Sequence, residues 1–532
     1  MADIAPTPPV LRPDNPPQRR LTDLAERFAQ RVIGDPDGTI LRGITLATAD
    51  LRPGEVFVAV PGAQRHGAHY AQAAVEHGAV AIVTDEAGAD IAAATDVPVV
   101  VVDDPRARLG ALSAWVYGTG PDDVMPRLFA ITGTNGKTSV SHLVEAMLGG
   151  LGLVTGLSST AERHIAGQVI PSRLTTPESS ELHALLALMR ERGVEAVMVE
   201  VSAQALTRHR VDGLVFDVAA FTNLTHDHLD DYGDMQTYLE AKLALFHHDR
   251  SRRAVVCVDS VEGRQVARRS TVPVTTVLTP ANADDADIDA EWRVELLDER
   301  QDGTLLRLVH RDGRALQTTM PLIGAHMAAN AGLAIVMLVE AGYHWERLVA
   351  LLDGRRMPGE LPGRIQRVSG DEGPAVYIDF AHSPDAFVRT LAAVRRVTPG
   401  RVLMLTAANG DRDVTKRAEM GAAAAAGSDI VIITDQHPRS EDPATIRAAV
   451  IAGARAARPD VELHEVAEPE RAIELAVSLA GPGDTILWAG PGHQHYREIQ
   501  GVRHPFDAAA LARGALRAAG WNSWTLPAPI VD

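Results

Sequence analysis

The sequence predicts an α/β protein of several domains, each built on a mostly parallel sheet. Its 532 residues correspond to about three or four domains of ordinary size. Apolar runs of strand length alternate with helical segments along most of the chain. One of these runs is followed by a glycine-rich turn that opens a helix, which is typical of nucleotide-binding sheets.

The first domain is expected over residues 21–124. The preceding residues, 1–20, carry repeated prolines and few groups to bury, so we expect a disordered lead-in there. A helix is predicted at 21–30, strands at 56–60, 79–84 and 97–103, and an alanine-rich helix at 68–77. Residues 121–126 are expected to form a linker.

The central domain is expected over residues 125–357. A strand is predicted at 128–132, a helix begins near Lys137, and further strands are predicted at 196–201, 218–223 and 254–258. The pairs Asp302-Gly303 and Asp312-Gly313 predict hairpins between 292 and 322, before a long helix at 325–341. This order predicts a mostly parallel sheet with an antiparallel extension.

The C-terminal domain is expected over residues 358–532 and repeats the α/β pattern. Strands are predicted at 375–380, 402–406, 430–434 and 485–489. A polar or glycine-containing segment follows each strand, at 381–383, 409–412, 437–440 and 490–493. Ligands of open α/β sheets bind at the carboxyl ends of strands, so these segments are expected to form a site.

Composition excludes several classes of protein. Hydrophobic residues make up 46% and charged residues 23%, which is typical of a globular chain. The formal net charge of −18 argues against nucleic acid as a partner. Cys257 is the single cysteine and lies in an apolar run, so no internal disulfide is expected. No run is long enough to span a membrane and no secretory signal is recognisable, which predicts a cytoplasmic protein without membrane insertion.

The most specific local motif runs from Gly133 to Ser139, with the sequence Gly-Thr-Asn-Gly-Lys-Thr-Ser. Its glycines allow backbone N–H groups to converge on phosphate oxygens, and the helix N-terminus favours negative charge. Lys137 can reach the β and γ phosphates, and Thr138 can hold Mg²⁺. The motif has Ile131 where a general phosphate loop has its first glycine, so the pattern alone also fits a fortuitous glycine-rich turn.

This loop resembles that of the Mur ligases and folylpolyglutamate synthetases, and the rest of the chain resembles the Mur ligases that add the third residue of the peptide. The resemblance continues, in the family's order, through the following segments: Leu174–Pro177, Glu200–Ser202, Phe221–Leu224, Asp227–Asp230, Ala241–Lys242, Leu245–Phe246, Gly363–Arg364, Asp379, Ala381–Ala386, Gly410–Asp413 and Pro438–Glu441. It implies a three-domain Mur ligase architecture, with a central P-loop-type sheet and a Rossmann-like C-terminal domain.

The resemblance also implies a reaction in peptidoglycan synthesis. Such a ligase uses ATP and Mg²⁺ to phosphorylate a carboxylate of UDP-N-acetylmuramoyl-L-Ala-D-Glu, and a free amino acid then displaces the phosphate. An acyl phosphate divides a difficult condensation into two easier steps, and the transferred phosphoryl group needs cations around it. We expect the enzyme to be a monomer.

The resemblance assigns residues to four groups. The catalytic and metal group contains Lys137, Glu200, His228 and Lys242 (as a carbamate), with Thr138 on the nucleotide-bound Mg²⁺. The ATP group contains Gly133, Thr134, Asn135, Gly136, Lys137, Thr138, Ser139, Asn330, Arg364 and Asp379. The UDP-muramoyl-dipeptide group contains Leu46, Thr48, Ala63, Gln64, Arg65, Thr175, Thr176, Ser202, Arg208 and Arg210. The amino-acid group contains Arg412, Gln436, His437, Pro438, Arg439, Gly490 and Gln494.

Some of these residues also have simpler interpretations. Lys242 lies in a helical pattern in which a lysine is usually solvated, and Asn330 also fits a polar position on a helix face. Arg208 stands where the family usually has glutamine, and Thr48 replaces a serine.

The amino-acid group lacks two carboxylates of the family pattern. Gln436 and Gln494 stand where diaminopimelate-adding members have carboxylates. Removing one partner of a buried charge pair costs on the order of 3–5 kcal/mol, so we expect meso-diaminopimelate not to be the preferred substrate. Homoserine, diaminobutyrate, ornithine and lysine remain candidates, with Arg412 or Arg439 binding the α-carboxylate.

Three alternatives to this ligase remain open. A simple phosphotransferase would form a phosphorylated product without an amine. An inactive or regulatory homologue would bind ATP without turnover, and the unusual Pro491 and Gln494 motivate this reading. A polyglutamylating ligase would accept folate and glutamate.

Overall fold

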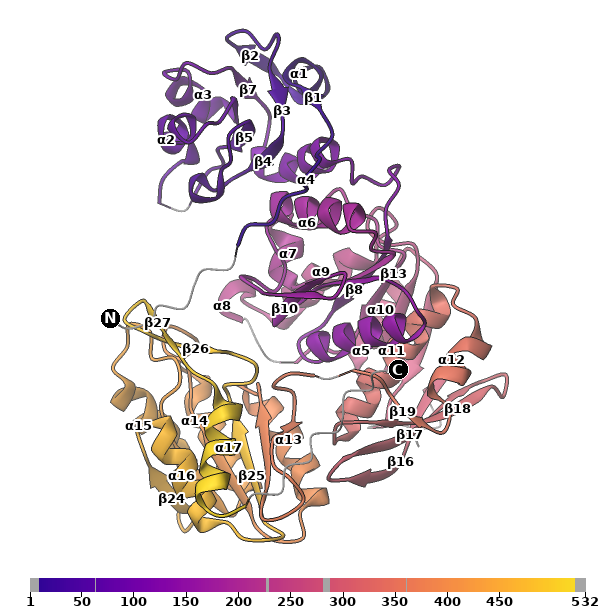
Figure 1. The fold of residues 1–532 in the computed structure, drawn as a ribbon, viewed down its shortest axis with the longest axis vertical. Helices are drawn as coiled ribbons and strands as arrows, with labels where there is room; N and C mark the ends of the chain where they lie inside the picture. The colour runs from indigo at the N-terminus through magenta and orange to yellow at the C-terminus, as the bar shows by residue number, and fades with distance from the viewer. Residues whose placement is uncertain (1–8, 63, 226–228, 281–287, 360, 522–532) are drawn as a thin grey trace.

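The computed structural model describes residues 9–62, 64–225, 229–280, 288–359 and 361–521. Figure 1 shows three bodies that follow one another along the chain, in indigo, magenta to pink, and orange to yellow. Each contains one main sheet. In the described part of the chain, no helix is both long enough and apolar enough to cross a bilayer.

The N-terminal domain is built on a five-stranded sheet in the order β2-β7-β6-β5-β4. Neighbouring strands are parallel except where β2 pairs with β7. The predicted helix at 68–77 begins as a 3₁₀ turn, η2. The elements are β1 (Arg19–Arg20), α1 (Leu21–Phe28), β2 (Arg31–Ile33), β3 (Ile40–Leu41), β4 (Gly43–Thr45), η1 (Thr48–Asp50), β5 (Glu55–Val58), η2 (Gly67–Tyr70), α2 (Ala71–Glu76), β6 (Ala81–Thr84), α3 (Glu86–Ala92), β7 (Val99–Val101) and α4 (Pro105–Tyr117).

The expectation that residues 1–20 are disordered is wrong for residues 9–20. Arg12 is buried and its Nε lies 2.5 Å from Oε1 of Glu55, which begins β5. Strand β1 pairs with β3, and the backbone N–H groups of Asp14 and Asn15 donate to the Glu191 carboxylate. Charged and backbone groups therefore hold this segment in place, whereas the prediction considered only its few apolar side chains.

The central domain contains a twelve-stranded mixed sheet in the order β11-β10-β9-β12-β8-β13-β14-β15-β16-β17-β18-β19. Strands β9, β12, β8, β13, β14, β15 and β16 run parallel, and β16 to β18 form the predicted antiparallel hairpins. The elements are β8 (Arg127–Thr132), α5 (Lys137–Gly150), β9 (Thr155–Ser158), β10 (Glu162–Ile165), β11 (Gln168–Pro171), α6 (Ser179–Glu191), β12 (Ala196–Glu200), α7 (Ala203–Thr207), β13 (Val218–Phe221), α8 (Leu229–Tyr232), α9 (Met235–Leu243), η3 (Ala244–Phe246), β14 (Ala254–Cys257), α10 (Val261–Arg269), β15 (Val274–Leu278), β16 (Trp292–Arg300), β17 (Gly303–His310), β18 (Ala315–Met320), α11 (Ala325–Glu340), α12 (Trp345–Leu352) and β19 (Arg355–Arg356).

Both faces of this sheet are covered, which explains why its central strands are apolar throughout. In β8, Phe129 and Ile131 face the cluster that contains α5 and α11, whereas Leu128 and Ala130 face the cluster that contains α6 and α7. Successive strand residues point to opposite faces, so a strand covered on both sides has no polar face.

The C-terminal domain has a six-stranded sheet in the order β20-β21-β25-β22-β23-β24, parallel except for β20. The parallel strands alternate with helices along the chain, as the sequence predicts, but their order in the sheet differs from that of the dinucleotide-binding Rossmann fold. The elements are β20 (Gln366–Arg367), β21 (Ala375–Asp379), α13 (Pro384–Val397), β22 (Val402–Thr406), α14 (Lys416–Gly427), β23 (Ile430–Ile433), α15 (Pro443–Ala457), β24 (Glu462–Glu465), α16 (Pro469–Leu479), β25 (Thr485–Ala489), β26 (Tyr496–Ile499), β27 (Val502–Pro505) and α17 (Ala508–Ala518).

Candidate functional site

The glycine-rich loop joins β8 to α5 and requires glycine at two positions. Gly133 has φ +146°, and a Cβ there would lie 1.9 Å from Oγ1 of Thr222. Gly136 has φ +92°, and its Cβ would lie 2.6 Å from Oδ1 of Asn330. Larger residues would push β13 and α11 away from the loop.

The charged groups of the loop are held by its own backbone and by the C-terminal domain. Lys137 Nζ donates to the carbonyl oxygens of Gly133 and Thr134 at 2.8 and 2.9 Å. Arg364 Nη2 donates to Oγ1 of Thr138 at 3.0 Å. The C-terminal domain thus contacts the loop directly where a triphosphate is expected.

Arg364, which contacts this loop, is half-buried, and Asp379 is buried. The Arg364 guanidinium lies 4.5 Å from the centroid of the Phe380 ring, and burial lowers its pKa. Burial also raises the pKa of Asp379, whose carboxylate accepts N–H bonds from Ile365 and Ala381 at 2.8 Å each. These bonds hold the segment that carries Arg364 against the end of β21, within the C-terminal domain.

Glu200 ends β12 and is fully buried. Its carboxylate accepts hydrogen bonds from the backbone N–H and the Oγ1 of Thr160, at 3.1 and 2.7 Å. Thr160 Oγ1 also lies 3.1 Å from Oγ1 of Thr175, so the carboxylate is connected to the predicted dipeptide-binding segment. Sequence reasoning missed Thr160, which lies in a loop without a recognisable motif.

Lys242 is 1% exposed, so it is not a solvated helix-face lysine. Its Nζ donates to the carbonyl oxygen of Gly133 at 3.1 Å and lies 4.4 Å from the centroid of the Tyr238 ring. The two lysines of the site, Lys137 and Lys242, therefore share one acceptor in the loop.

The described residues include no cluster of three or more histidine, cysteine or acidic side chains that could hold a metal ion. His228, one of the predicted ligands, lies outside the described residues. Thr138 and Glu200 present oxygen atoms, the donors that Mg²⁺ prefers. The Lys242 ammonium is not a ligand as it stands, but a carbamate on the same nitrogen would add oxygen donors.

A cavity of about 400 Å³ brings together most of the predicted ATP group with parts of the catalytic and dipeptide groups. It lies at the carboxyl ends of the strands, where α/β sheets bind their ligands. The lining includes the loop residues Thr134, Asn135, Gly136, Lys137, Thr138 and Ser139, together with Thr175, Ser202, Arg210, Lys242, Asn330, Arg364 and Asp379. A second cavity of about 510 Å³ is lined by Arg127, Glu195 and Asp217, among others, and contains none of the predicted residues.

The dipeptide group is only partly in this cavity. Thr176 is buried beneath it, where its Oγ1 donates to the Glu200 carbonyl oxygen at 2.8 Å and accepts the Ser202 N–H at 3.1 Å. Arg210 lines the cavity and pairs with Glu178 at 2.8 Å. Arg208 is exposed and does not line it.

The predicted uridine-binding residues lie in the N-terminal domain, away from this cavity. Leu46 and Thr48 are half-buried and follow β4, and Thr48 begins η1. Gln64 and Arg65 are exposed, and the Arg65 guanidinium lies 5.8 Å from the centroid of the Tyr70 ring. Ala63 lies outside the described residues.

The predicted amino-acid residues form a separate group at the carboxyl ends of β22, β23 and β25. Burial lowers the pKa of His437, whose Nδ1 accepts the Glu498 N–H at 3.0 Å. His437 Nε2 must therefore carry the proton, and it donates to Oε1 of Gln494 at 2.8 Å. Gln436 is buried against Gly490, where a Cβ would lie 2.3 Å from the Gln436 Oε1. Among the residues that the structure describes, none is a hydrogen-bond partner of the Gln436 Nε2.

The two arginines of this group, Arg439 and Arg412, differ in exposure and in their hydrogen-bond partners. Pro438 is buried, and the following Arg439 has a left-handed φ of +52° and donates from Nη1 to the carbonyl oxygen of Gly410 at 2.9 Å. Arg412 is exposed, and its Nη1 donates to the carbonyl oxygen of Asp411 at 3.0 Å.

A histidine cluster between the central and C-terminal domains was not predicted. Burial alone would lower the pKa of His164, but hydrogen bonds with Glu145 and Glu162 outweigh burial and raise its pKa to about 9. Burial lowers the pKa of His142 to about 4 and that of His493 to about 3. His142 and His164 stand in no sequence motif, whereas His493 lies in the segment 490–493 that was expected to contribute to a site. Only the fold brings the three histidines together.

Three family models match the chain. They are described as the Mur ligase family catalytic domain over residues 41–117, the Mur ligase middle domain over 131–338, and the Mur ligase glutamate ligase domain over 363–492.

Similar proteins cover nearly the full length. The chain is 55% identical over 518 residues to the UDP-N-acetylmuramyl-tripeptide synthetase of Leifsonia xyli subsp. xyli, which covers 97% of this chain and 99% of that protein. It is 41% identical over 514 residues to the UDP-N-acetylmuramoyl-L-alanyl-D-glutamate–2,6-diaminopimelate ligase of Streptomyces coelicolor, covering 95% and 98%.

Solved structures agree in fold. A UDP-N-acetylmuramoyl-L-alanyl-D-glutamate–2,6-diaminopimelate ligase superposes with a TM-score of 0.65 at 26% identity, covering 95% of this chain and 100% of that one. The MurF ligase of Thermotoga maritima, solved in complex with ADP, gives a TM-score of 0.60 at 18% identity and covers 85% and 94%.

Proposed function

Because the chain belongs to the Mur ligase family and is an ATP-dependent ligase, we propose that it joins an amino acid to the D-Glu of UDP-N-acetylmuramoyl-L-Ala-D-Glu. The observation that carries this proposal is the single cavity in which Lys137, Lys242 and Thr175 meet Arg364 of the C-terminal domain. Binding of a phosphate donor and a carboxylate acceptor in one cavity would fulfil the main requirement of such a ligase.

In the first step, a D-Glu carboxylate oxygen attacks the γ-phosphorus of ATP, and ADP leaves. Lys137 and the N-terminus of α5 bind the phosphate oxygens, and Arg364 adds a cation from the C-terminal domain. Mg²⁺, held by Thr138 and Glu200 together with His228 and a carbamate on Lys242, would supply further positive charge to the transferred group. Asn330 and Asp379 line the nucleotide side of the cavity.

In the second step, the amine of the incoming amino acid attacks the acyl carbon, and inorganic phosphate leaves. We assign the binding of this amino acid to Gln436, His437, Arg439 and Gln494, with Arg439 or Arg412 on its α-carboxylate. This group does not line the cavity. The C-terminal domain must therefore bring the amino acid toward the acyl phosphate.

The added residue is proposed not to be meso-diaminopimelate. His437 donates to Oε1 of Gln494, and the Gln436 amide is neutral, so these two positions provide no carboxylate for a second ammonium group. Homoserine, diaminobutyrate, ornithine and lysine are the candidates.

We further propose a monomeric, cytoplasmic enzyme with domain limits near 124/125 and 357/358. The UDP part of the substrate is assigned to the N-terminal domain through Leu46, Thr48, Ala63, Gln64 and Arg65. Thr175, Thr176, Ser202, Arg208 and Arg210 are assigned to the dipeptide.

The test is phosphate release by the purified protein with ATP, Mg²⁺, UDP-N-acetylmuramoyl-L-Ala-D-Glu and single amino acids, with mass analysis of the UDP-linked product. We expect release that depends on one of the four candidates, with the matching gain in mass. Release without an amine would identify a phosphotransferase, and ATP binding without release would identify an inactive homologue.

A further inference from the structure

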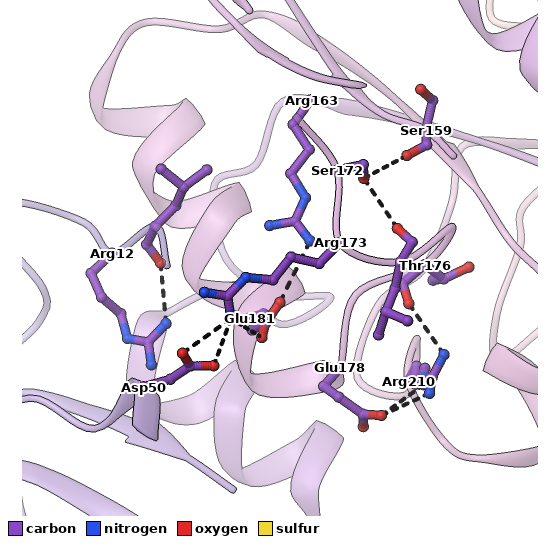
Figure 2. A network of polar contacts seen from close by, with 12 residues as sticks. Arg12, Asp50, Ser159, Arg163, Ser172, Arg173, Thr176, Glu178, Glu181 and Arg210 are labelled. Atoms are coloured by element: carbon purple, nitrogen blue, oxygen red, sulfur yellow. Dashed lines mark hydrogen bonds and ion pairs between the residues drawn. The ribbon is translucent and has the colours of Figure 1, made fainter. Parts of the chain in front are cut away.

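The segment that carries Thr175 and Thr176 is tied to the N-terminal domain at both of its ends. It runs from Arg173 to Glu178, between β11 and α6. Arg173 Nη1 lies 3.0 and 2.9 Å from the two carboxylate oxygens of Asp50 (Figure 2). At the other end, Glu178 Oε2 accepts a hydrogen bond from Nη1 of Arg106 at 2.7 Å. The two ties flank the pair of threonines.

The two partners in the N-terminal domain, Asp50 and Arg106, lie in different elements. Asp50 ends η1, the short helix that begins at Thr48. Arg106 lies in the first turn of α4, and its backbone N–H donates to the capping carboxylate of Asp104. The Asp50 tie thus connects the element that carries Thr48 to the segment that carries Thr175.

Further charged groups reinforce each tie, as Figure 2 shows. Glu178 Oε1 also pairs with Arg210, which lines the cavity, at 2.8 Å. On the other side, Glu181 lies 4.0 Å from Arg173 and accepts from Nη2 of Arg163 at 3.5 Å. Burial lowers the pKa of Arg163, which is 2% exposed at its side chain.

These pairs are more shielded than ordinary surface ion pairs. The side chains of Asp50 and Arg173 are 14% and 23% exposed, and that of Glu178 is 17% exposed. Exposed pairs contribute little because water and salt screen them, and partial burial reduces that screening. Both oxygens of the Asp50 carboxylate lie within hydrogen-bond distance of one nitrogen, Nη1 of Arg173, and a hydrogen bond between charged groups is stronger than a neutral one.

We propose that the Asp50–Arg173 and Arg106–Glu178 pairs form a two-point tether that sets the distance between the uridine-binding and dipeptide-binding surfaces. These four are positioning residues, and the inference rests on the proposed function. A substrate bound at both ends gains from a fixed separation, because binding of the remote UDP group then orients the reacting carboxylate. A ligand that binds at one end only gains nothing from the tether.

The test compares the UDP-linked dipeptide, which is expected to bind both surfaces, with UDP alone, which is expected to bind only the N-terminal domain. For Asp50→Ala, Arg173→Ala and Arg106→Ala, we expect the KM for the UDP-linked dipeptide to rise about fivefold or more. The inhibition constant of UDP alone and the KM for ATP should stay within about twofold of the parent values. Combining Asp50→Ala with Arg173→Ala should be no worse than either change alone, because the two residues act through each other.

Arg108→Ala is the matched control. Arg108 lies on α4, as Arg106 does, and pairs with both oxygens of Asp103 within the N-terminal domain at 2.8 Å each. We expect Arg108→Ala to leave unchanged the KM for the UDP-linked dipeptide, the inhibition constant of UDP and the KM for ATP. Should Arg173→Ala fail to fold, Asp50→Asn, which keeps the side-chain volume, gives the same comparison.

Four outcomes would overturn the tether. An equal rise in the KM for the UDP-linked dipeptide and in the inhibition constant of UDP would mean that Asp50 only shapes the uridine pocket. Unchanged constants, or additive effects of the two substitutions, would show that the pair does not couple the two surfaces. An inactive parent protein would remove the proposed function and the tether together, whereas an active parent with uncoupled variants would remove the tether alone.

Discussion

Arg364 of the C-terminal domain donates a hydrogen bond to Thr138 of the ATP loop, 226 positions earlier in the chain, at 3.0 Å. The same junction includes a contact of 3.4 Å from Nδ2 of Asn135 to Oδ2 of Asp385. The nucleotide site therefore depends on two domains, and its activity should respond to changes in either of them.

Replacement of Arg364 by alanine should reduce kcat/KM for ATP by about 100-fold. A half-buried guanidinium that donates to the loop is expected to act on charge that develops during phosphoryl transfer, and such groups contribute roughly 2.7–4 kcal/mol. Steady-state kinetics with varied ATP measures this effect. Arg395→Ala, on α13 of the same domain, removes an exposed ion pair with Asp429 and should leave kcat/KM unchanged. Equal losses in both variants would contradict a specific role for Arg364.

Replacement of Lys242 by methionine should abolish turnover while the protein still folds, because the two side chains have similar length and the site is apolar on the Tyr238 side. If Lys242 is carbamylated, intact-mass measurement under bicarbonate should show the gain of one CO₂ in the parent and not in the variant. A fully active variant would show that neither the ammonium nor a carbamate at this position takes part in the reaction.

Restoring a carboxylate in the amino-acid group should change substrate choice. We expect Gln494→Glu, alone or with Gln436→Asp, to raise the ratio of kcat/KM for diaminopimelate to that for the native amino acid by about 10- to 100-fold. Competition assays with both amino acids measure this ratio directly. No change in the ratio would mean that these glutamines do not contact the side chain of the incoming amino acid.

Acid should destabilise the protein through His183. Burial lowers the pKa of this histidine to about 4, and its ring nitrogens contact the Thr119 hydroxyl at 2.7 Å and the Asp212 carbonyl oxygen at 3.0 Å. The unfolded chain binds the proton at an ordinary pKa near 6.5. The neutral, buried ring therefore contributes its full share of the folding free energy only above about pH 6.5. This contribution is lost progressively as the pH falls toward 4.

The free energy of unfolding should fall by about 2–3 kcal/mol between pH 7 and pH 4 through this histidine. Thermal unfolding midpoints of the parent and of His183→Gln across this range test it, since the variant lacks the titrating ring. The difference between the two proteins should narrow as the pH falls. A constant difference would contradict a buried neutral imidazole at this position.

Sequence patterns predicted the elements that contain the loop and the central strands, because apolar runs such as 128–132 report burial on both faces of a sheet. The helix at 21–30 was predicted too long, since the chain already enters β2 at Arg31. Strands β9 to β11 were not predicted, because they are short and contain polar residues such as Arg163 and His164.

The candidate site was predictable where one short motif carries several groups, as at Gly133–Ser139. Thr160, Arg163 and Asp50 carry no motif, and their contacts arise between segments that are distant in the sequence. The segment around Arg12 was expected to be disordered for the same reason, because its partner Glu55 is 43 residues away in the sequence.

The central claim is amide formation through an acyl phosphate, and transfer of a heavy oxygen isotope tests it most directly. The D-Glu side-chain carboxylate of the UDP-linked dipeptide is labelled, and the inorganic phosphate released in the amine-dependent reaction is analysed by mass. We expect one labelled oxygen per phosphate, because the carboxylate oxygen that attacks ATP leaves with the phosphate. Amide formation that releases only unlabelled phosphate would contradict the account.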